Sequence, residues 1–361
     1  MTTEMTAEGL PVPTAPPVTD GAPVVEGGSA LEGEPGEKPR RRRKAILALF
    51  LLGLLAMLAT IAIWYLLFRQ PIPVPIPVIP SSEVPAYLTA VYGTQRPVGV
   101  AVSPSGDRIY VAQSEGDRIG VAFDAGGNKI GTMAPPATTG TDHAPVYVAV
   151  DPLTDEVYVS DRLAGTIYIY DRDGAYQREL TLAVPRPGWQ PLGLAFDKAG
   201  NLYVTDLSGP YQKVLVIDRT AQVVRTLGER DQLSFPNGLA VDGAGNVYVS
   251  DSNNGRLLMF DAGGTVRAQI GRGAGQGNLG LPRGLAVDGQ GRVFVADATG
   301  QGVFIYRAPS DDSRRLDFLG FIGGEGVADA QFEYPNSVAV DARGRVYVAD
   351  TFNDRVQIWS Y

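Results

Sequence analysis

The chain has 361 residues, a formal net charge of −8 and a sequence pI of about 4.9. Nucleic acid and anionic lipid attract basic surfaces, so an acidic chain predicts no nucleic-acid partner. The chain has no cysteine, which excludes a disulfide framework and a thiolate metal site. It has one histidine, His143, which excludes a zinc site built from several histidines. We therefore expect no metal or other cofactor, and we expect His143 to be solvated.

Residues 1–44 are rich in Pro, Gly, Thr, Ala and Glu and have no periodic apolar face. Such a composition cannot bury enough apolar surface to offset the entropy of folding. We therefore expect a disordered tail, which ends in the basic run 40–44.

Residues 45–68 read AILALFLLGLLAMLATIAIWYLLF, without a charge. About 20 apolar residues span a bilayer, so this segment is expected to be a transmembrane helix. A cleaved signal peptide is the alternative, but its apolar region is usually about 7–15 residues and ends in a small-residue cleavage site. The basic residues precede the span and only Arg69 follows it, which places the N-terminus in the cytoplasm and the rest outside the cell membrane.

Residues 69–83 contain proline at every second position from Pro71 to Pro77. Alternating proline favours the extended polyproline II conformation, so this segment is expected to be a semi-rigid stalk. The segment that follows, 84–361, is expected to form one folded domain.

One pattern is repeated six times in residues 84–361. Each copy begins at a proline, and by subtraction the copies lie 45 to 53 residues apart: Pro97, Pro145, Pro191, Pro236, Pro282 and Pro335. The first five copies each hold four short β-branched runs bounded by Gly, Asn and Asp, and the sixth holds three; such runs are typical of strands. Four strands per copy predict a blade of a β-propeller.

The ends of this domain predict how the ring closes. The sixth copy stops after its third strand, at the C-terminus, and 86–93 (AYLTAVYG) resembles the fourth strand of the other copies. We expect this N-terminal strand to complete the last blade, which removes an open sheet edge.

The copies PNGLAVDGAGNVYVSD (236–251) and PNSVAVDARGRVYVAD (335–350), with the later NDRVQ of 353–357, resemble the NHL-repeat family. The resemblance implies an all-β, six-bladed propeller of four-stranded blades. It is similar to extracytoplasmic NHL sensor domains of bacterial membrane proteins, although no kinase precedes the span here. Three positions depart from the pattern, namely Ser103, Gln113 and Tyr147, the last of which replaces a glycine.

A carboxylate ends the second strand in most copies: Asp161, Asp206, Asp251, Asp297 and Asp350. A ring of carboxylates at the channel mouth suggests cation binding, or hydrolysis as in gluconolactonase-like propellers. The other interpretation is that each Asp accepts hydrogen bonds from the backbone of its own turn. Repetition in nearly every copy favours the second interpretation, because an active site breaks the symmetry of repeats.

The residue after each proline varies, since Asn237, Arg283 and Asn336 are polar while Val98, Val146 and Leu192 are apolar. This asymmetry predicts an off-centre binding patch, and Trp189 is a further candidate anchor. The candidate binding residues are Trp189, Asn237, Arg283, Asn336, Asp206, Asp251, Asp297 and Asp350.

No catalytic residue can be assigned from this pattern. We expect a membrane-anchored sensor or scaffold module that binds a protein or cell-envelope ligand. The alternative is a lactonase-like or lyase-like enzyme that uses carboxylates at the channel mouth.

Overall fold

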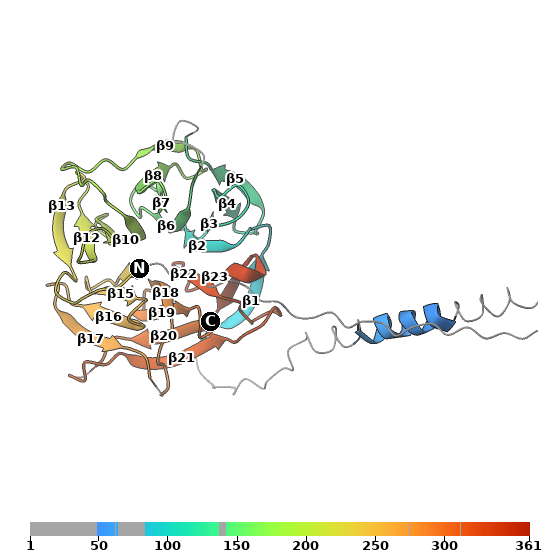
Figure 1. Cartoon of the computed structure of the whole chain (residues 1–361). Coiled ribbons are helices and arrows are strands. Elements are labelled where there is room, and N and C mark those ends of the chain that lie inside the picture. Colours follow the sequence, from blue (N-terminus) through green and yellow to red (C-terminus); the bar gives the residue numbers. More distant parts are fainter. Residues whose placement is uncertain (1–48, 62, 64–83, 137–141, 274, 311) are drawn as a thin grey trace, which may run out of the picture. The chain divides into compact units, whose positions relative to one another are not determined.

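The computed structural model describes residues 49–61, 63, 84–136, 142–273, 275–310 and 312–361. The chain divides into two units, Met1–Arg69 and Gln70–Tyr361. The second unit consists of six four-stranded antiparallel sheets placed around a centre, as Figure 1 shows. It is a six-bladed β-propeller, as the repeats predict.

In each of the first three blades the strands follow chain order from the centre outward. Blade 1 contains β2 (Pro97–Val102), β3 (Arg108–Gln113), β4 (Gly120–Asp124) and β5 (Lys129–Met133). Blade 2 contains β6 (Pro145–Val150), β7 (Val157–Asp161), β8 (Thr166–Tyr170) and β9 (Tyr176–Glu179). Blade 3 contains β10 (Pro191–Phe196), β11 (Leu202–Asp206), β12 (Lys213–Ile217) and β13 (Val223–Leu227).

The next two blades repeat this order. Blade 4 contains β14 (Pro236–Val241), β15 (Val247–Asp251), β16 (Arg256–Phe260) and β17 (Val266–Ile270). Blade 5 contains β18 (Pro282–Val287), β19 (Arg292–Asp297), β20 (Gly302–Arg307) and β21 (Asp317–Gly323). Every blade thus begins at one of the repeated prolines, where the lack of an N–H costs no ladder hydrogen bond.

Blade 6 joins the two ends of the domain. It contains β22 (Pro335–Val340), β23 (Val346–Asp350), β24 (Arg355–Ser360) and, as its outer strand, β1 (Ala86–Val91). β1 pairs antiparallel with β24, and the Tyr87 ring meets the Trp359 ring edge-on at 5.8 Å. The predicted closure by the N-terminal strand is confirmed, although the strand ends at Val91, before Gly93.

The core lies between neighbouring blades. The aromatic residue of each second strand is buried there: Tyr110, Tyr158, Tyr203, Tyr248, Phe294 and Tyr347. One core cluster, for example, combines Tyr347 and Val356 of blade 6 with Val111 and Phe123 of blade 1. These aromatics are therefore packing residues that join the blades, and each blade depends on both neighbours.

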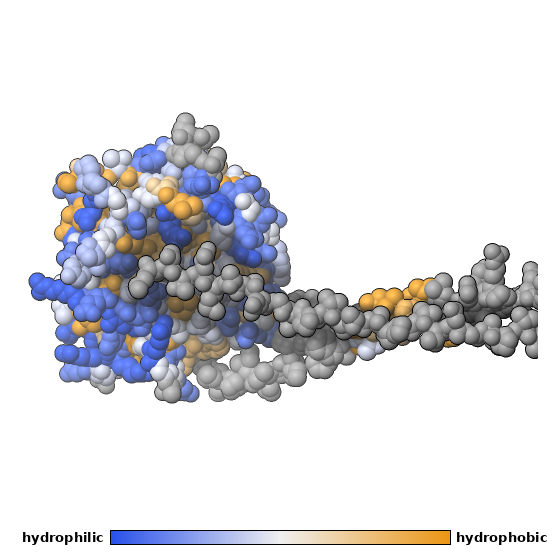
Figure 2. Space-filling model, in the orientation of Figure 1, coloured by the Kyte–Doolittle hydropathy of each residue, from blue (hydrophilic) through white to orange (hydrophobic). Residues whose placement is uncertain are grey.

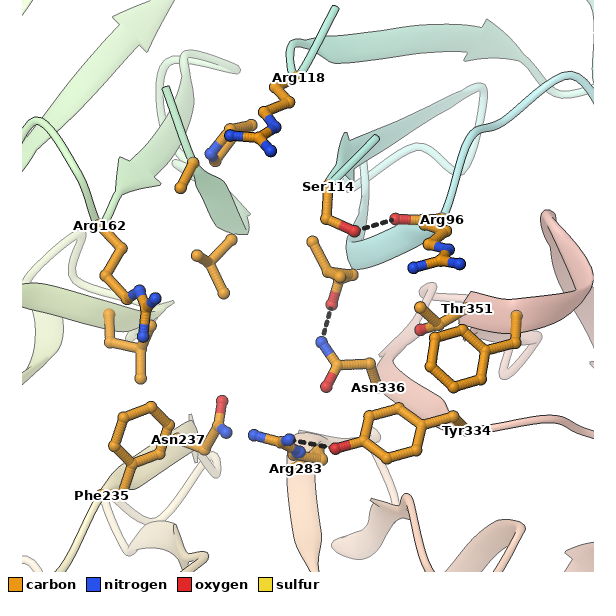
Figure 3. A pocket seen from close by; sticks show the side chains of 16 residues that line it. Arg96, Ser114, Arg118, Arg162, Phe235, Asn237, Arg283, Tyr334, Asn336 and Thr351 are labelled. Atoms are coloured by element: carbon orange, nitrogen blue, oxygen red, sulfur yellow. Dashed lines mark hydrogen bonds between the residues drawn. The ribbon is translucent and has the colours of Figure 1, made fainter. Parts of the chain in front are cut away.

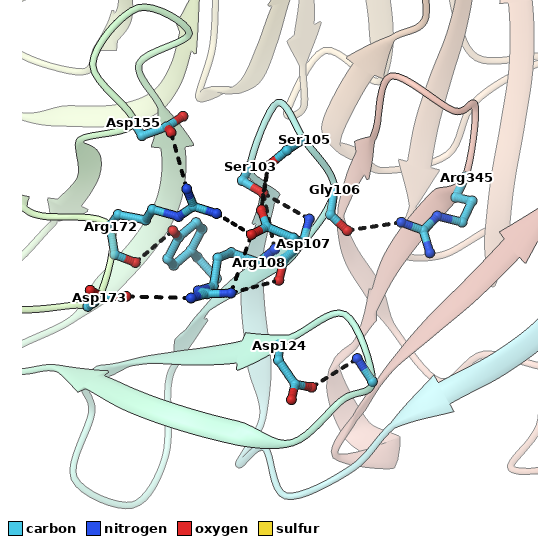
Figure 4. Close-up of polar contacts among 12 residues, drawn as sticks. Ser103, Ser105, Gly106, Asp107, Arg108, Asp124, Asp155, Arg172, Asp173 and Arg345 are labelled. Carbon is cyan, nitrogen blue, oxygen red and sulfur yellow. Dashed lines mark hydrogen bonds and ion pairs between the residues drawn. The ribbon is translucent and has the colours of Figure 1, made fainter.

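The turn between the first two strands is built around an Asp. In blade 4 the Asp242 Oδ1 accepts hydrogen bonds from the N–H groups of Ala244 and Asn246, both at 2.9 Å, and Gly245 takes a positive φ of 85°. In blade 1 Ser103 replaces the Asp, and its hydroxyl accepts from the N–H of Asp107 at 3.1 Å (Figure 4). The turn of blade 1 still contains a carboxylate, that of Asp107, which forms an ion pair with Arg172 of blade 2.

In the N-terminal unit, residues 49–61 and 63 are helical, and Figure 2 shows hydrophobic side chains there. Within the described residues, no helix is both long and apolar enough to cross a membrane. The expected span 45–68 extends beyond this helix on both sides, and the expected tail 1–44 and the expected stalk 69–83 lie outside the described residues.

Candidate functional site

A pocket of about 330 Å³ lies where the first strands of the six blades begin (Figure 3). All six residues that follow the repeated prolines line it: Val98, Val146, Leu192, Asn237, Arg283 and Asn336. The pocket is therefore the mouth of the central channel, and it contains one equivalent position from every blade. Its volume is at the lower end of small-molecule sites, which hold about 300–1,000 Å³.

The lining is divided between apolar and polar side chains. Val98, Val146 and Leu192 come from blades 1 to 3, whereas Asn237, Arg283 and Asn336 come from blades 4 to 6. Arg96, Arg118 and Arg162 also line the pocket, so it has four arginines in all. Among the lining residues there is no Asp, Glu or His, and the site is basic although the chain is acidic.

Tyr147 lies beneath the opening and fixes one of the lining amides. Tyr147 is the second residue after the repeated proline, and this position is Gly or Ser in the other blades. At Gly193 of blade 3, for example, a side chain would clash, because its Cβ would lie 2.3 Å from the carbonyl oxygen of Asn237. Tyr147 is 5% exposed, and its hydroxyl donates to the Oδ1 of Asn237 at 2.6 Å. Burial raises the pKa of Tyr147 far above its usual value, so the hydroxyl stays a neutral donor.

Three lining residues immediately before a proline have a left-handed backbone, namely Arg96, Phe235 and Tyr334 (φ 46°, 53° and 60°). The left-handed region costs a non-glycine residue about 1–2 kcal/mol, and residues before proline favour extended backbone instead. Such strain persists only where the surroundings hold it, and it is frequent at functional sites.

Side chains from the preceding blade hold this strained backbone. Each acceptor stands directly before the third strand of that blade: Gln212 accepts from the N–H of Phe235, Gln301 from that of Tyr334, and Asp354 from that of Arg96. Equivalent positions in three blades therefore supply the same support.

Two arginines and two aromatic rings form a continuous stack on one side of the pocket. The guanidinium carbon of Arg96 lies 5.1 Å from the Phe352 ring centroid, and the Phe352 and Tyr334 rings stack at 5.1 Å. Arg283 lies 5.5 Å from the Tyr334 ring centroid and donates a hydrogen bond to its hydroxyl. Cation–π contacts at such distances contribute about 0.5–2 kcal/mol each, so the stack holds both guanidinium groups in place.

The candidate carboxylates lie outside the pocket lining and are buried: Asp206, Asp251, Asp297 and Asp350. Each accepts a hydrogen bond from the backbone of the loop that enters its own blade; Ser234 N–H, for instance, donates to Asp251 at 2.7 Å, and Leu281 N–H donates to Asp297 at 2.9 Å. This geometry fits the structural interpretation, because most of these oxygens already bond the protein.

Two of these carboxylates also hold an arginine of the third strand. The Nε of Arg256 lies 2.7 Å from Asp251, and the Nε of Arg355 lies 2.8 Å from Asp350. Asp206 is different, since its Oδ2 is buried without a hydrogen bond and Arg186 approaches it only to 3.9 Å.

Trp189 does not line the pocket. It packs against the core cluster between blades 2 and 3, and its indole N–H is buried without a hydrogen-bond partner. The structure therefore separates Trp189 from Asn237, Arg283 and Asn336, which it brings together.

The expectation that His143 is solvated is wrong. Its side chain is 11% exposed, and its Nδ1 lies 2.8 Å from the Oδ2 of Asp161. Asp161 also accepts from the N–H of Ala144, so the pair holds the loop that enters blade 2. The part of the chain that the structure describes has no group of three or more His, Asp or Glu placed to hold a metal ion.

Sequence reasoning missed Arg96, Arg118, Arg162, Tyr334 and Phe352 as lining residues. Arg96 and Tyr334 directly precede repeated prolines, and Phe352 follows Asp350 by two residues. Alignment of the six copies would have shown that these loop positions vary, but the sequence does not show that they share one pocket with the residues after the prolines.

Comparisons with known proteins agree with this fold. Residues 193–318 match the SMP-30/gluconolactonase/LRE-like region, and residues 332–359 match the NHL repeat. No curated protein matches the chain significantly.

Solved structures resemble the propeller at low sequence identity. A protein of unknown function from Bacteroides thetaiotaomicron has a TM-score of 0.57 at 17% identity and covers 78% of this chain and 72% of its own. Virginiamycin B lyase from Staphylococcus aureus has a TM-score of 0.52 at 13% identity (77% and 99% covered), and the Kuenenia stuttgartiensis hydrazine synthase has 0.52 at 16% (75% and 97%). At these identities the likeness concerns the fold alone.

Proposed function

Because the chain is an NHL-repeat β-propeller, we propose that it is a binding module whose ligand occupies the pocket at the channel mouth. The observation that carries this proposal is the coincidence of broken symmetry with a cavity. The second strands and their Asp residues recur with few changes, whereas the six positions after the prolines differ in chemistry and share one pocket. Repeats keep structural motifs and vary where they bind.

We further propose that the propeller is displayed outside the cell, on a single transmembrane helix formed by 45–68, where it acts as a sensor or scaffold. The uncharged segment and the basic run before it support this orientation. Its partner would then be a protein or another cell-envelope ligand.

Cysteine labelling in intact cells tests the orientation, because the chain has no cysteine of its own. We expect Ser310→Cys, on an exposed loop of blade 5, to react with a membrane-impermeant maleimide. Ser29→Cys should be protected until the membrane is permeabilised. The reverse pattern would contradict the proposed topology.

Pocket blocking tests the binding site. In Val146→Trp a large side chain fills the pocket, and in Ala244→Trp the same side chain is placed on an exposed turn at the opposite end of the strands. The full-length protein is screened for thermal shifts against envelope-derived peptides and small molecules. We expect ligands that stabilise the wild type and Ala244→Trp but not Val146→Trp; stabilisation that survives in Val146→Trp would place the site elsewhere.

Hydrolysis is the second candidate function, and the match to the gluconolactonase-like region is the observation that favours it. The lining lacks Asp, Glu and His, the side chains most suited to general acid–base work. The test is turnover of a lactone panel by the purified protein. Turnover that Asp206→Asn or Asp251→Asn abolishes, without loss of folding, would favour the enzyme.

A further inference from the structure

The chemistry of the channel-mouth pocket indicates what kind of ligand it takes. We propose that it binds a carboxylate that has an N–H group and an apolar side chain next to it, as in an N-acylated amino acid or the C-terminal residue of a peptide. This inference rests on the proposed function, because it names the ligand class of that same pocket.

The first argument is charge. Four arginines line the pocket together with no carboxylate, so nothing in the lining neutralises them. The ion pairs of the described residues give Arg96 one partner, Glu115 at 3.0 Å, and both side chains are about half exposed; such pairs are weak. Arg118, Arg162 and Arg283 have no ion pair among the described residues. A cleft of one sign concentrates ligands of the other sign.

The second argument is the state of Arg283. Tyr334 occupies one of its Nη groups, and its Nε is buried without a hydrogen-bond partner. A buried unpaired donor on a charged group is costly, by about 1–3 kcal/mol or more. Arg283 lines the pocket, and a carboxylate can accept two parallel N–H bonds from a guanidinium, so this side chain suits such a ligand.

The third argument is the direction of the two amides. Tyr147 donates to the Oδ1 of Asn237, which leaves the Nδ2 of Asn237 to donate, and Asn237 is 2% exposed. Asn336 is used in the opposite sense, because its Nδ2 donates to the carbonyl oxygen of Val98 at 2.7 Å and its Oδ1 is left to accept. Figure 3 shows Arg283 between Asn237 and Tyr334. The polar end thus offers donors for an anion and an acceptor for a neighbouring N–H.

The fourth argument is the opposite half of the lining. Val98, Val146, Leu192 and Phe235 line the pocket and supply its apolar wall. Burial of an apolar side chain against this wall contributes about 25 cal/mol per Å². A free inorganic anion would leave this wall in contact with water, so the pocket fits an amphipathic ligand.

Four probes test the proposal on the full-length protein by isothermal titration. N-acetyl-L-phenylalanine represents the free acid, and a tetrapeptide that ends in phenylalanine represents a chain end. N-acetyl-L-phenylalaninamide is the neutral control, and phenyl phosphate asks whether a phosphate is preferred. We expect the amide to bind at least tenfold more weakly than the acid, and added salt to weaken binding of the acid but not of the amide. The ratio of the dissociation constants of the acid and the tetrapeptide then shows whether the ligand is a free N-acylated amino acid or the end of a peptide chain.

Variants then assign the contacts. Arg283→Met should weaken N-acetyl-L-phenylalanine at least tenfold, and Arg283→Lys should weaken it less, because it keeps the charge but loses the planar fork. Arg118→Gln with Arg162→Gln should weaken it about fivefold without a folding cost, since both side chains are exposed. Arg267→Gln, an exposed arginine on the outer strand of blade 4, is the matched control and should change nothing.

Three results would overturn the inference. Equal binding of the acid and the amide, both lost in Val146→Trp, would leave the pocket as the binding site but remove the anion. Tighter binding of phenyl phosphate than of both carboxylate probes would replace the carboxylate by a phosphate. Ligands that bind independently of Val146 would refute the proposed function as well.

Discussion

An engineered disulfide across the seam of the ring is expected to stabilise the propeller strongly. Ala86 of β1 and Ser360 of β24 are opposite one another in the ladder, and neither side chain is part of the core. Opposite residues of an antiparallel pair have Cα atoms about 4.5–5.5 Å apart, within the range of disulfides. Ala86→Cys with Ser360→Cys therefore joins the ends covalently without disturbing packing.

The size of the effect follows from the loop that the bond closes. It reaches from residue 86 to residue 360, which is almost the whole second unit. Loss of entropy in the unfolded chain predicts about 5 kcal/mol as an upper value for so long a loop. At about 2–4 °C per kcal/mol for a domain of this size, the melting temperature should rise by about 10–20 °C.

Calorimetry of the oxidised and reduced double variant measures this rise, and the single variants are the controls. Because the wild type has no cysteine, every disulfide in the sample comes from the introduced pair. Leu88→Cys with Ser360→Cys tests the register, since Leu88 stands at the irregularity of the ladder and is not opposite Ser360. Efficient bonding of that pair, or none of the first, would refute the closure by β1.

Three further predictions concern single side chains. Tyr147→Phe leaves the Oδ1 of Asn237 buried without its donor and should cost about 1–3 kcal/mol in unfolding free energy, measured by urea denaturation. Asp251→Asn should lower the melting temperature through loss of its ion pair with Arg256, while ligand affinity at the pocket stays unchanged. Hydrogen bonds from Ser105 and then Ser103, with Arg172 nearby, lower the pKa of Asp107 to about 2. Its ionised carboxylate therefore contributes to the free energy of unfolding above pH 4, and this contribution is lost as the pH falls toward 2. Asp107→Asn should slightly flatten the plot of stability against pH in this range, and the effect is small because the side chain is 41% exposed.

The architecture could be predicted from the sequence because local signals and the repeat agree. Proline at the start of each first strand and the aromatic of each second strand recur six times, and the Asp and Gly of the turn recur in most copies, so errors in single copies do not matter. The fourth strand of blade 6 could be assigned to 86–93 because the other copies show the pattern of a fourth strand, and the structure has this strand at Ala86–Val91.

The candidate site was predictable only in part. Asn237, Arg283 and Asn336 could be found because they stand at one position of the repeat. Phe352 could not, because its contact with Tyr334 depends on the path of two loops, and loop conformations carry no repeat signal. Trp189 is a candidate by its loop and its residue type, neither of which fixes the position of a side chain, and the structure packs it between blades 2 and 3.

The same reasoning explains why the pocket is located where it is. The glycines and Asp residues of the repeat have structural roles that limit substitution. A Cβ on Gly238 would lie 2.6 Å from the carbonyl oxygen of Arg283. Asp297 accepts hydrogen bonds from the N–H of Leu281, before the first strand of its blade, and from that of Gly300, after the second. The residue after each proline does not have such a structural role in every blade, because its side chain points into the opening that all six blades share. Selection for a ligand can therefore act there one blade at a time without weakening the ring. In a propeller, the variable position that faces the axis can therefore change to fit a ligand with the least loss of stability.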